Sequence, residues 1–64
     1  MALVLRDPPK TQNDAFSALE SAVGSEAFEA DEGIAIVANE LSIDDTAATQ
    51  EIRRLIQMGC VEEA

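Results

Sequence analysis

Histidine, tryptophan and tyrosine are absent from this 64-residue chain, and its only cysteine is Cys60. These absences exclude a disulfide framework, a Cys/His zinc site and histidine-based acid–base catalysis. The only aromatic residues are Phe16 and Phe28, and 11 of the apolar residues are alanine. The resulting core is small, and a pocket of about 300 Å³ or more for a large cofactor is not expected. We therefore expect one domain spanning residues 1–64, with no cofactor, no metal and no enzymatic activity.

Basic residues are also scarce, since 4 of them face 13 acidic residues and give a net charge of −9. Such an excess destabilises a compact state through self-repulsion. Many acids, many alanines and a sole lysine, Lys10, resemble the proteins of salt-loving archaea, where concentrated salt screens this repulsion. The alternative is an acidic protein of an ordinary cell that binds a basic surface.

Long apolar runs are missing too. The two longest, from Met1 to Leu5 and from Ile34 to Ala38, have five residues each, far short of the roughly 18–20 residues that a membrane span needs. The first nine residues, MALVLRDPP, are too short and too quickly polar for a secretory signal. We expect a cytoplasmic protein that does not contact membranes, and one unpaired cysteine agrees with a reducing compartment.

The first half of the chain predicts a strand, a helix and a loop. Residues 2–6 alternate as a short strand, which the following Asp-Pro-Pro ends. Residues 13–23 have helical spacing, with Thr11 as the expected cap and Asp14 in capping-box position. The acidic range 26–32 is expected to be a solvated loop, with one helical turn that tucks Phe28 inward.

The second half predicts two further helices and a terminal strand. A helix over 32–41, capped by Asp31, presents an inner stripe of Ile34, Val37, Ala38 and Leu41. A helix over 45–58, capped by Asp44 or Asp45, presents an inner stripe of Ala48, Ile52, Leu55 and Ile56. Gly59 ends this helix, and Cys60 folds back on Leu55 as a buried, inert thiol that begins a strand over 60–63.

The segment ANELSIDDTAATQEIRRLIQMGCVE, residues 38–62, resembles the winged helix-turn-helix family of bacterial and archaeal regulators. Ala38 and Leu41 match core positions of the first motif helix, and Ser42 stands in the turn where the family often has glycine. The resemblance implies a mainly α, three-helix winged helix-turn-helix-like domain with a minimal β-sheet formed by the termini.

Three features depart from the family pattern. Only three residues follow Val61, so residues 2–6 are expected to pair with 60–63 in place of a second wing strand. The range 44–58 has three acids and two bases, a net charge of −1. Ile36 stands where the family has a polar residue, and either packs under the first strand or belongs to a contact surface.

The resemblance implies a small DNA-binding transcriptional regulator that uses the third helix as its recognition helix. The candidate DNA-binding residues are Thr46, Ala47, Thr49, Gln50, Arg53 and Arg54. Glutamine can pair with adenine, methyl groups can contact thymine, and hydroxyls and arginines can hold phosphates. In the competing interpretation, Thr46 only caps the helix, Gln50 is a plain surface residue and Arg53 pairs with Asp45 or Glu51.

Four bases supply little of the phosphate neutralisation on which DNA affinity depends. The alternative function is therefore a non-catalytic protein–protein interaction module without DNA binding. Its contact surface would be the acidic range 26–32, Ile36 or an open strand edge, and its partner another protein or a second copy of the chain.

Overall fold

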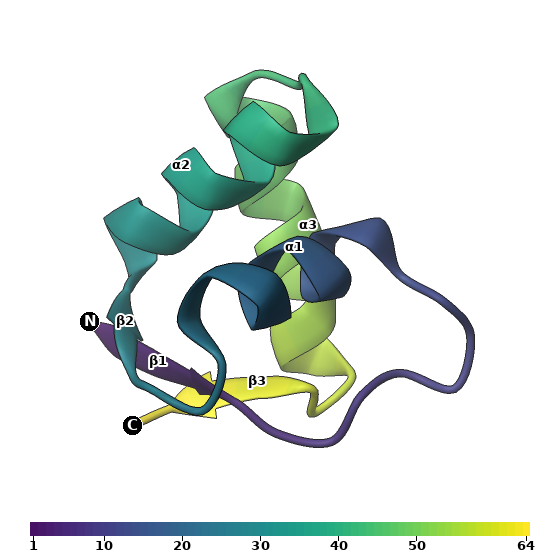
Figure 1. Ribbon diagram of the computed structural model, residues 1–64, viewed down its shortest axis with the longest axis vertical. Coiled ribbons are helices and arrows are strands. Elements are labelled where there is room, and N and C mark those ends of the chain that lie inside the picture. The colour runs from purple at the N-terminus through teal and green to yellow at the C-terminus, as the bar shows by residue number, and fades with distance from the viewer.

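Three helices pack on one side of a small sheet, and both chain termini lie at that sheet (Figure 1). The computed structural model describes residues 1–64. The elements are β1 (Ala2–Leu5), α1 (Asp14–Val23), β2 (Phe28–Glu29), α2 (Ala30–Leu41), α3 (Asp45–Gln57) and β3 (Val61–Glu63). A mainly α architecture with three helices and a minimal sheet is thereby confirmed.

The sheet has the strand order β2–β1–β3, and both pairs are antiparallel. Leu5 lies opposite Val61, so the predicted pairing of the first and last strands is confirmed. The Arg6 amide donates to the Cys60 carbonyl at 2.7 Å, which continues this ladder beyond the strand ends. The first strand of the chain thus occupies the centre of the sheet.

The prediction of a solvated loop over 26–32 is wrong for most of that range. Phe28 and Glu29 form β2, which pairs with β1 and places Leu3 opposite Phe28. The Phe28 side chain points inward as expected and is only 3% exposed, but a strand rather than a helical turn positions it. The cause is the central place of β1, whose second edge is free to pair with this segment.

Helix α1 begins at Asp14, and its cap is Asn13, whose Oδ1 accepts from the Phe16 amide at 3.0 Å. The predicted Thr11 cap is therefore wrong, because the side chain directly before the helix already satisfies this free amide. Ala15, Phe16 and Leu19 are buried along the inner face of the helix.

Helix α2 begins at Ala30, two residues before the predicted start, so Asp31 lies inside its first turn rather than at its cap. Glu29 is the cap residue, and its amide donates to Glu32 Oε1 at 3.1 Å in a capping box. Of the predicted inner stripe Val37 is fully buried, while the other three members pack against the core and stay partly exposed.

Helix α3 begins after Asp44, whose Oδ1 accepts from the Ala47 amide at 2.8 Å. At its other end Gly59 has a φ of 81°, its amide donates to the Ile56 carbonyl at 3.1 Å, and the Cys60 amide donates to the Leu55 carbonyl at 2.9 Å. These two bonds form a Schellman motif, so the predicted glycine stop is confirmed.

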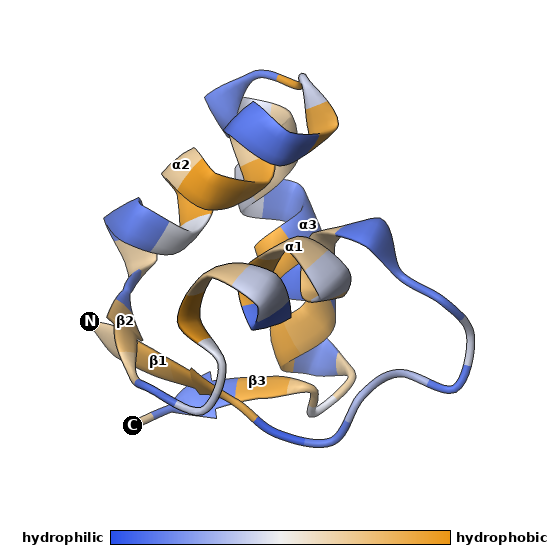
Figure 2. Ribbon diagram, viewed as in Figure 1, coloured by the Kyte–Doolittle hydropathy of each residue, from blue (hydrophilic) through white to orange (hydrophobic).

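The core contains eleven buried side chains drawn from every helix and strand. They are Leu3, Ala15, Phe16, Leu19, Phe28, Val37, Ala48, Ile52, Leu55, Cys60 and Val61. Hydrophobic stretches of the ribbon, orange in Figure 2, occur on all three helices and on β1 and β3. Cys60 is buried as predicted, and Ile36 is half-buried against this core. None of the three helices combines the length and the apolar content that a membrane crossing requires.

One member of the predicted inner stripe of α3 does not join the core. Ala48, Ile52 and Leu55 are buried, but Ile56 is 40% exposed. Ile56 borders a hollow beside Met1, where no other element covers it. The prediction that Ile56 faces inward is therefore wrong, and its side chain belongs to the surface.

Candidate binding surface along helix α3

The candidate DNA-binding residues of α3 fall into two groups by exposure. Thr46, Gln50, Arg53 and Arg54 are exposed, whereas Ala47 and Thr49 are half-buried. Gln50 therefore points to the outside of the bundle, as the spacing of the buried residues predicts. Thr46 does not cap the helix, because Asp44 does so.

Two of these side chains are engaged within α3 itself. The Thr49 hydroxyl donates to the Asp45 carbonyl at 2.7 Å, and Arg54 Nη1 donates to Glu51 Oε2 at 3.1 Å. Arg54, rather than Arg53, thus forms the ion pair with Glu51 that the competing interpretation predicts. Exposed pairs of this kind contribute only about 0–1 kcal/mol, but they do lower the charge that Arg54 presents to a ligand.

Arg53 has no carboxylate partner within 4.0 Å. Of the other basic side chains, Arg6 pairs with Glu62 at 3.0 Å, and Lys10 is likewise without a partner. Arg53 is therefore the one unpaired cation on α3, on a chain of net charge −9.

An apolar hollow of about 240 Å³ lies between α3, the start of α2 and the first residues of the chain. Its lining consists of Met1, Leu3, Ala30, Ile34, Thr49, Ile52, Arg53 and Ile56. Met1 is 69% exposed and Ile56 is 40% exposed, so apolar surface is open to solvent at its rim. The helical period predicts that Ile52, Leu55 and Ile56 lie on roughly the same face of α3. It does not predict how much of that face the neighbouring elements cover.

A second hollow of about 240 Å³ adjoins the first, since both are lined by Ile34 and Thr49. Its remaining lining residues are Asp31, Ala35 and Asp45. Neither carboxylate forms an ion pair. We call the two hollows together the α3 groove: its floor is apolar, one end is acidic, and Arg53 lines the other part.

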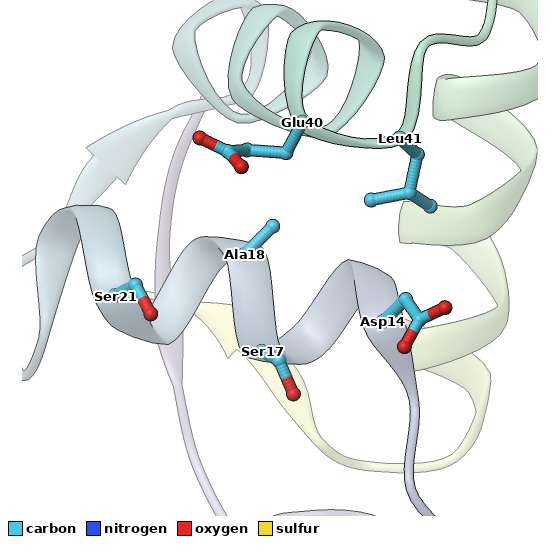
Figure 3. Close-up of a pocket in the computed structure, with 6 residues that line it drawn as sticks. All are labelled: Asp14, Ser17, Ala18, Ser21, Glu40 and Leu41. Atoms are coloured by element: carbon cyan, nitrogen blue, oxygen red, sulfur yellow. The ribbon is translucent and has the colours of Figure 1, made fainter.

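The largest hollow, about 510 Å³, lies between α1 and α2 and is lined by Asp14, Ser17, Ala18, Ser21, Glu40 and Leu41 (Figure 3). Glu40 reaches from α2 over Ala18 of α1, while the polar side chains of α1 are exposed to solvent. No three metal-ligating side chains come together anywhere in the structure, and no buried polar side-chain atom lacks a hydrogen-bond partner. This hollow therefore holds no group that points to a ligand.

Comparison with known protein families, with curated proteins and with solved structures finds no match to this chain.

Proposed function

We propose that the protein is a non-catalytic protein-binding module with a winged-helix-like architecture. The arrangement of α2, a tight turn, α3 and then β3 supports this assignment. So does the position of β1, which pairs with β3 where a wing would supply its second strand. Architecture of this kind serves both DNA binding and protein binding, so the function has to be argued from the surface.

The observation that carries the proposal is the α3 groove. Exposed apolar side chains that gather around a concavity are typical of interaction sites, whereas scattered ones are not. Ile34 and Ile56 line this groove from two different helices, and Met1, which precedes β1, lines it as well. An apolar side chain from a partner would be shielded from water there.

DNA binding by α3 is the second candidate, and the exposure of Gln50 and Arg53 on α3 favours it. The charge weighs against it, because Arg54 is paired with Glu51 and because Asp31 and Asp45 border the same part of α3. Phosphates would meet one unpaired arginine there, which leaves little sequence-independent affinity.

The two candidates share Thr49 and Arg53 but differ in their other residues, and this difference provides the test. Groove binding needs Ile56, whereas DNA readout needs Gln50. Random peptides displayed on phage are selected against the wild-type protein and counter-selected against Ile56→Asn. Met58→Asn is the matched control, because Met58 is 54% exposed and lies outside the groove.

Peptides that bind wild type and Met58→Asn but not Ile56→Asn support the proposal. In parallel, labelled random-sequence and genomic duplexes are titrated by fluorescence anisotropy. Duplex binding that is lost in Gln50→Ala and Arg53→Ala, with no Ile56-dependent peptide, overturns the proposal in favour of the regulator. A self-associated particle in sedimentation velocity that dissociates in Ile56→Asn would identify a second copy as the occupant.

A further inference from the structure

The α3 groove is acidic at one end and apolar along its floor, and this difference narrows the class of partner that it can bind. This inference rests on the proposed function. We propose that the groove binds a cationic amphipathic segment of a partner protein. Apolar side chains of that segment lie between Ile34 and Ile56, and its lysines or arginines face Asp31 and Asp45.

The order of residues along α3 sets the length of the segment. Asp45, Thr49, Arg53 and Ile56 follow one another at about one residue per turn, and each lines at least one of the two hollows. From Asp45 to Ile56 the helix rises by about 16 Å. A partner helix of about three turns, with apolar residues at positions i, i+3, i+4 and i+7, spans that distance.

Charge decides between the possible occupants. Asp31 and Asp45 have no cation within the chain, so they are free to meet one from a partner. The chain has a net charge of −9, which attracts a cationic segment over a long range. The same charge repels duplex DNA and repels a second copy of the chain.

Arg53 adds a direction to this recognition. It lines the apolar hollow but not the acidic one, and it has no carboxylate partner. A partner that is cationic along its entire length would place like charge against Arg53. The segment therefore has its lysines or arginines at the Asp45 end of α3 and a neutral or acidic residue near Arg53.

The test uses three labelled helical peptides of about 16 residues with the same leucine stripe. Their remaining positions are lysine, glutamine or glutamate in the half that faces the acidic end, and glutamine elsewhere. Binding is measured by fluorescence anisotropy, and the contact surface by amide chemical-shift changes.

The lysine peptide is expected to bind most tightly and to shift Ile34, Thr49 and Ile56. Asp31→Asn and Asp45→Asn each weaken it by about twofold to fivefold, as for an exposed charge pair. Asp14→Asn is the matched control, because Asp14 also occupies the first position of a helix but lies away from the groove. Ile56→Asn weakens all binding by about tenfold, and Met58→Asn does not.

Each contrary result has a separate meaning. If the glutamine peptide binds as tightly as the lysine peptide and both require Ile56, the cationic partner is overturned while the groove remains a binding site. If the lysine peptide binds equally well to wild type and Ile56→Asn, the attraction is charge alone, and both proposals fail. A fourth peptide has its lysines in the other half, which faces Arg53. If this peptide binds as tightly as the lysine peptide, the role given to Arg53 is overturned.

Discussion

Gly33 lies in the interior of α2, where a residue with low helix propensity is not expected. A Cβ at this position would lie 2.7 Å from Phe28 Cε2, 3.0 Å from Phe28 Cδ2 and 3.4 Å from Ile52 Cδ1. Carbon atoms in contact rest about 3.5–4.0 Å apart, so Gly33→Ala forces the Phe28 ring to move by about 1 Å. The ring cannot move outward easily, because it is 3% exposed and its strand is paired with β1.

Two opposing contributions decide the effect of Gly33→Ala on the free energy of unfolding. Alanine favours the helix by about 1 kcal/mol, and overpacking of a filled core costs about 1–3 kcal/mol. We expect a net loss of about 1 kcal/mol. Ala35→Gly, at an exposed position of the same helix, isolates the propensity contribution and is expected to cost about 1 kcal/mol.

Phe28→Leu removes the ring atoms that the Cβ of Gly33→Ala would meet. Phe28→Leu also lowers the free energy of unfolding by itself. In that background Gly33→Ala is expected to stabilise the protein by up to about 1 kcal/mol, which reverses its sign. Urea unfolding of the four combinations, followed by far-ultraviolet circular dichroism at one fixed salt concentration, measures the coupling. Stabilisation by Gly33→Ala in the wild-type background, equal to the loss in Ala35→Gly, would refute the packing argument.

Three further predictions concern the turn between α2 and α3, the cap of α3 and the net charge of the chain. Ser42 has a φ of 55°, so Ser42→Gly is expected to stabilise by about 0.5 kcal/mol in thermal denaturation, and Ser25→Gly is not. Asp44→Ala removes the cap of α3 and is expected to cost about 1 kcal/mol in urea unfolding, while Asp44→Asn keeps the cap and is neutral. Two like charges one radius of gyration apart, 10.1 Å, repel by about 0.4 kcal/mol in water, so the melting temperature is expected to rise between about 0.1 M and 1 M NaCl. A melting temperature that does not change with the salt concentration over that range would contradict the role given to self-repulsion.

The helices could be predicted from the sequence because each has a buried stripe and a local end signal. The predicted range 45–58 corresponds to α3 at Asp45–Gln57, and its ends depend on Asp44 and Gly59, which lie within two residues of the helix in the sequence. β2 could not be predicted in this way, because two residues have no periodicity. Its existence depends on pairing with β1, which is distant in the sequence.

The candidate surface was predictable in part for the same reason. The exposure of Gln50 follows from the helical period once Ala48, Ile52 and Leu55 are placed inward. The exposure of Ile56 does not follow from the helical period. The period gives the direction in which a side chain points, but not whether a neighbouring element extends far enough to cover it. The groove lies where β1, α2 and α3 come together and no further element covers their apolar side chains.

Salt separates the two candidate functions because they draw on different forces at the same helix face. At most two arginines of α3, one of them paired with Glu51, could neutralise phosphates and so release counterions from DNA. The logarithm of the DNA affinity is therefore expected to fall with the logarithm of the salt concentration at a slope of about −0.9 to −1.8. Contact with Ile34 and Ile56 is not weakened by screening, because burial of apolar surface does not depend on charge. A cationic partner should therefore lose the part of its affinity that depends on Asp31 and Asp45 in concentrated salt, and keep the part that depends on Ile56.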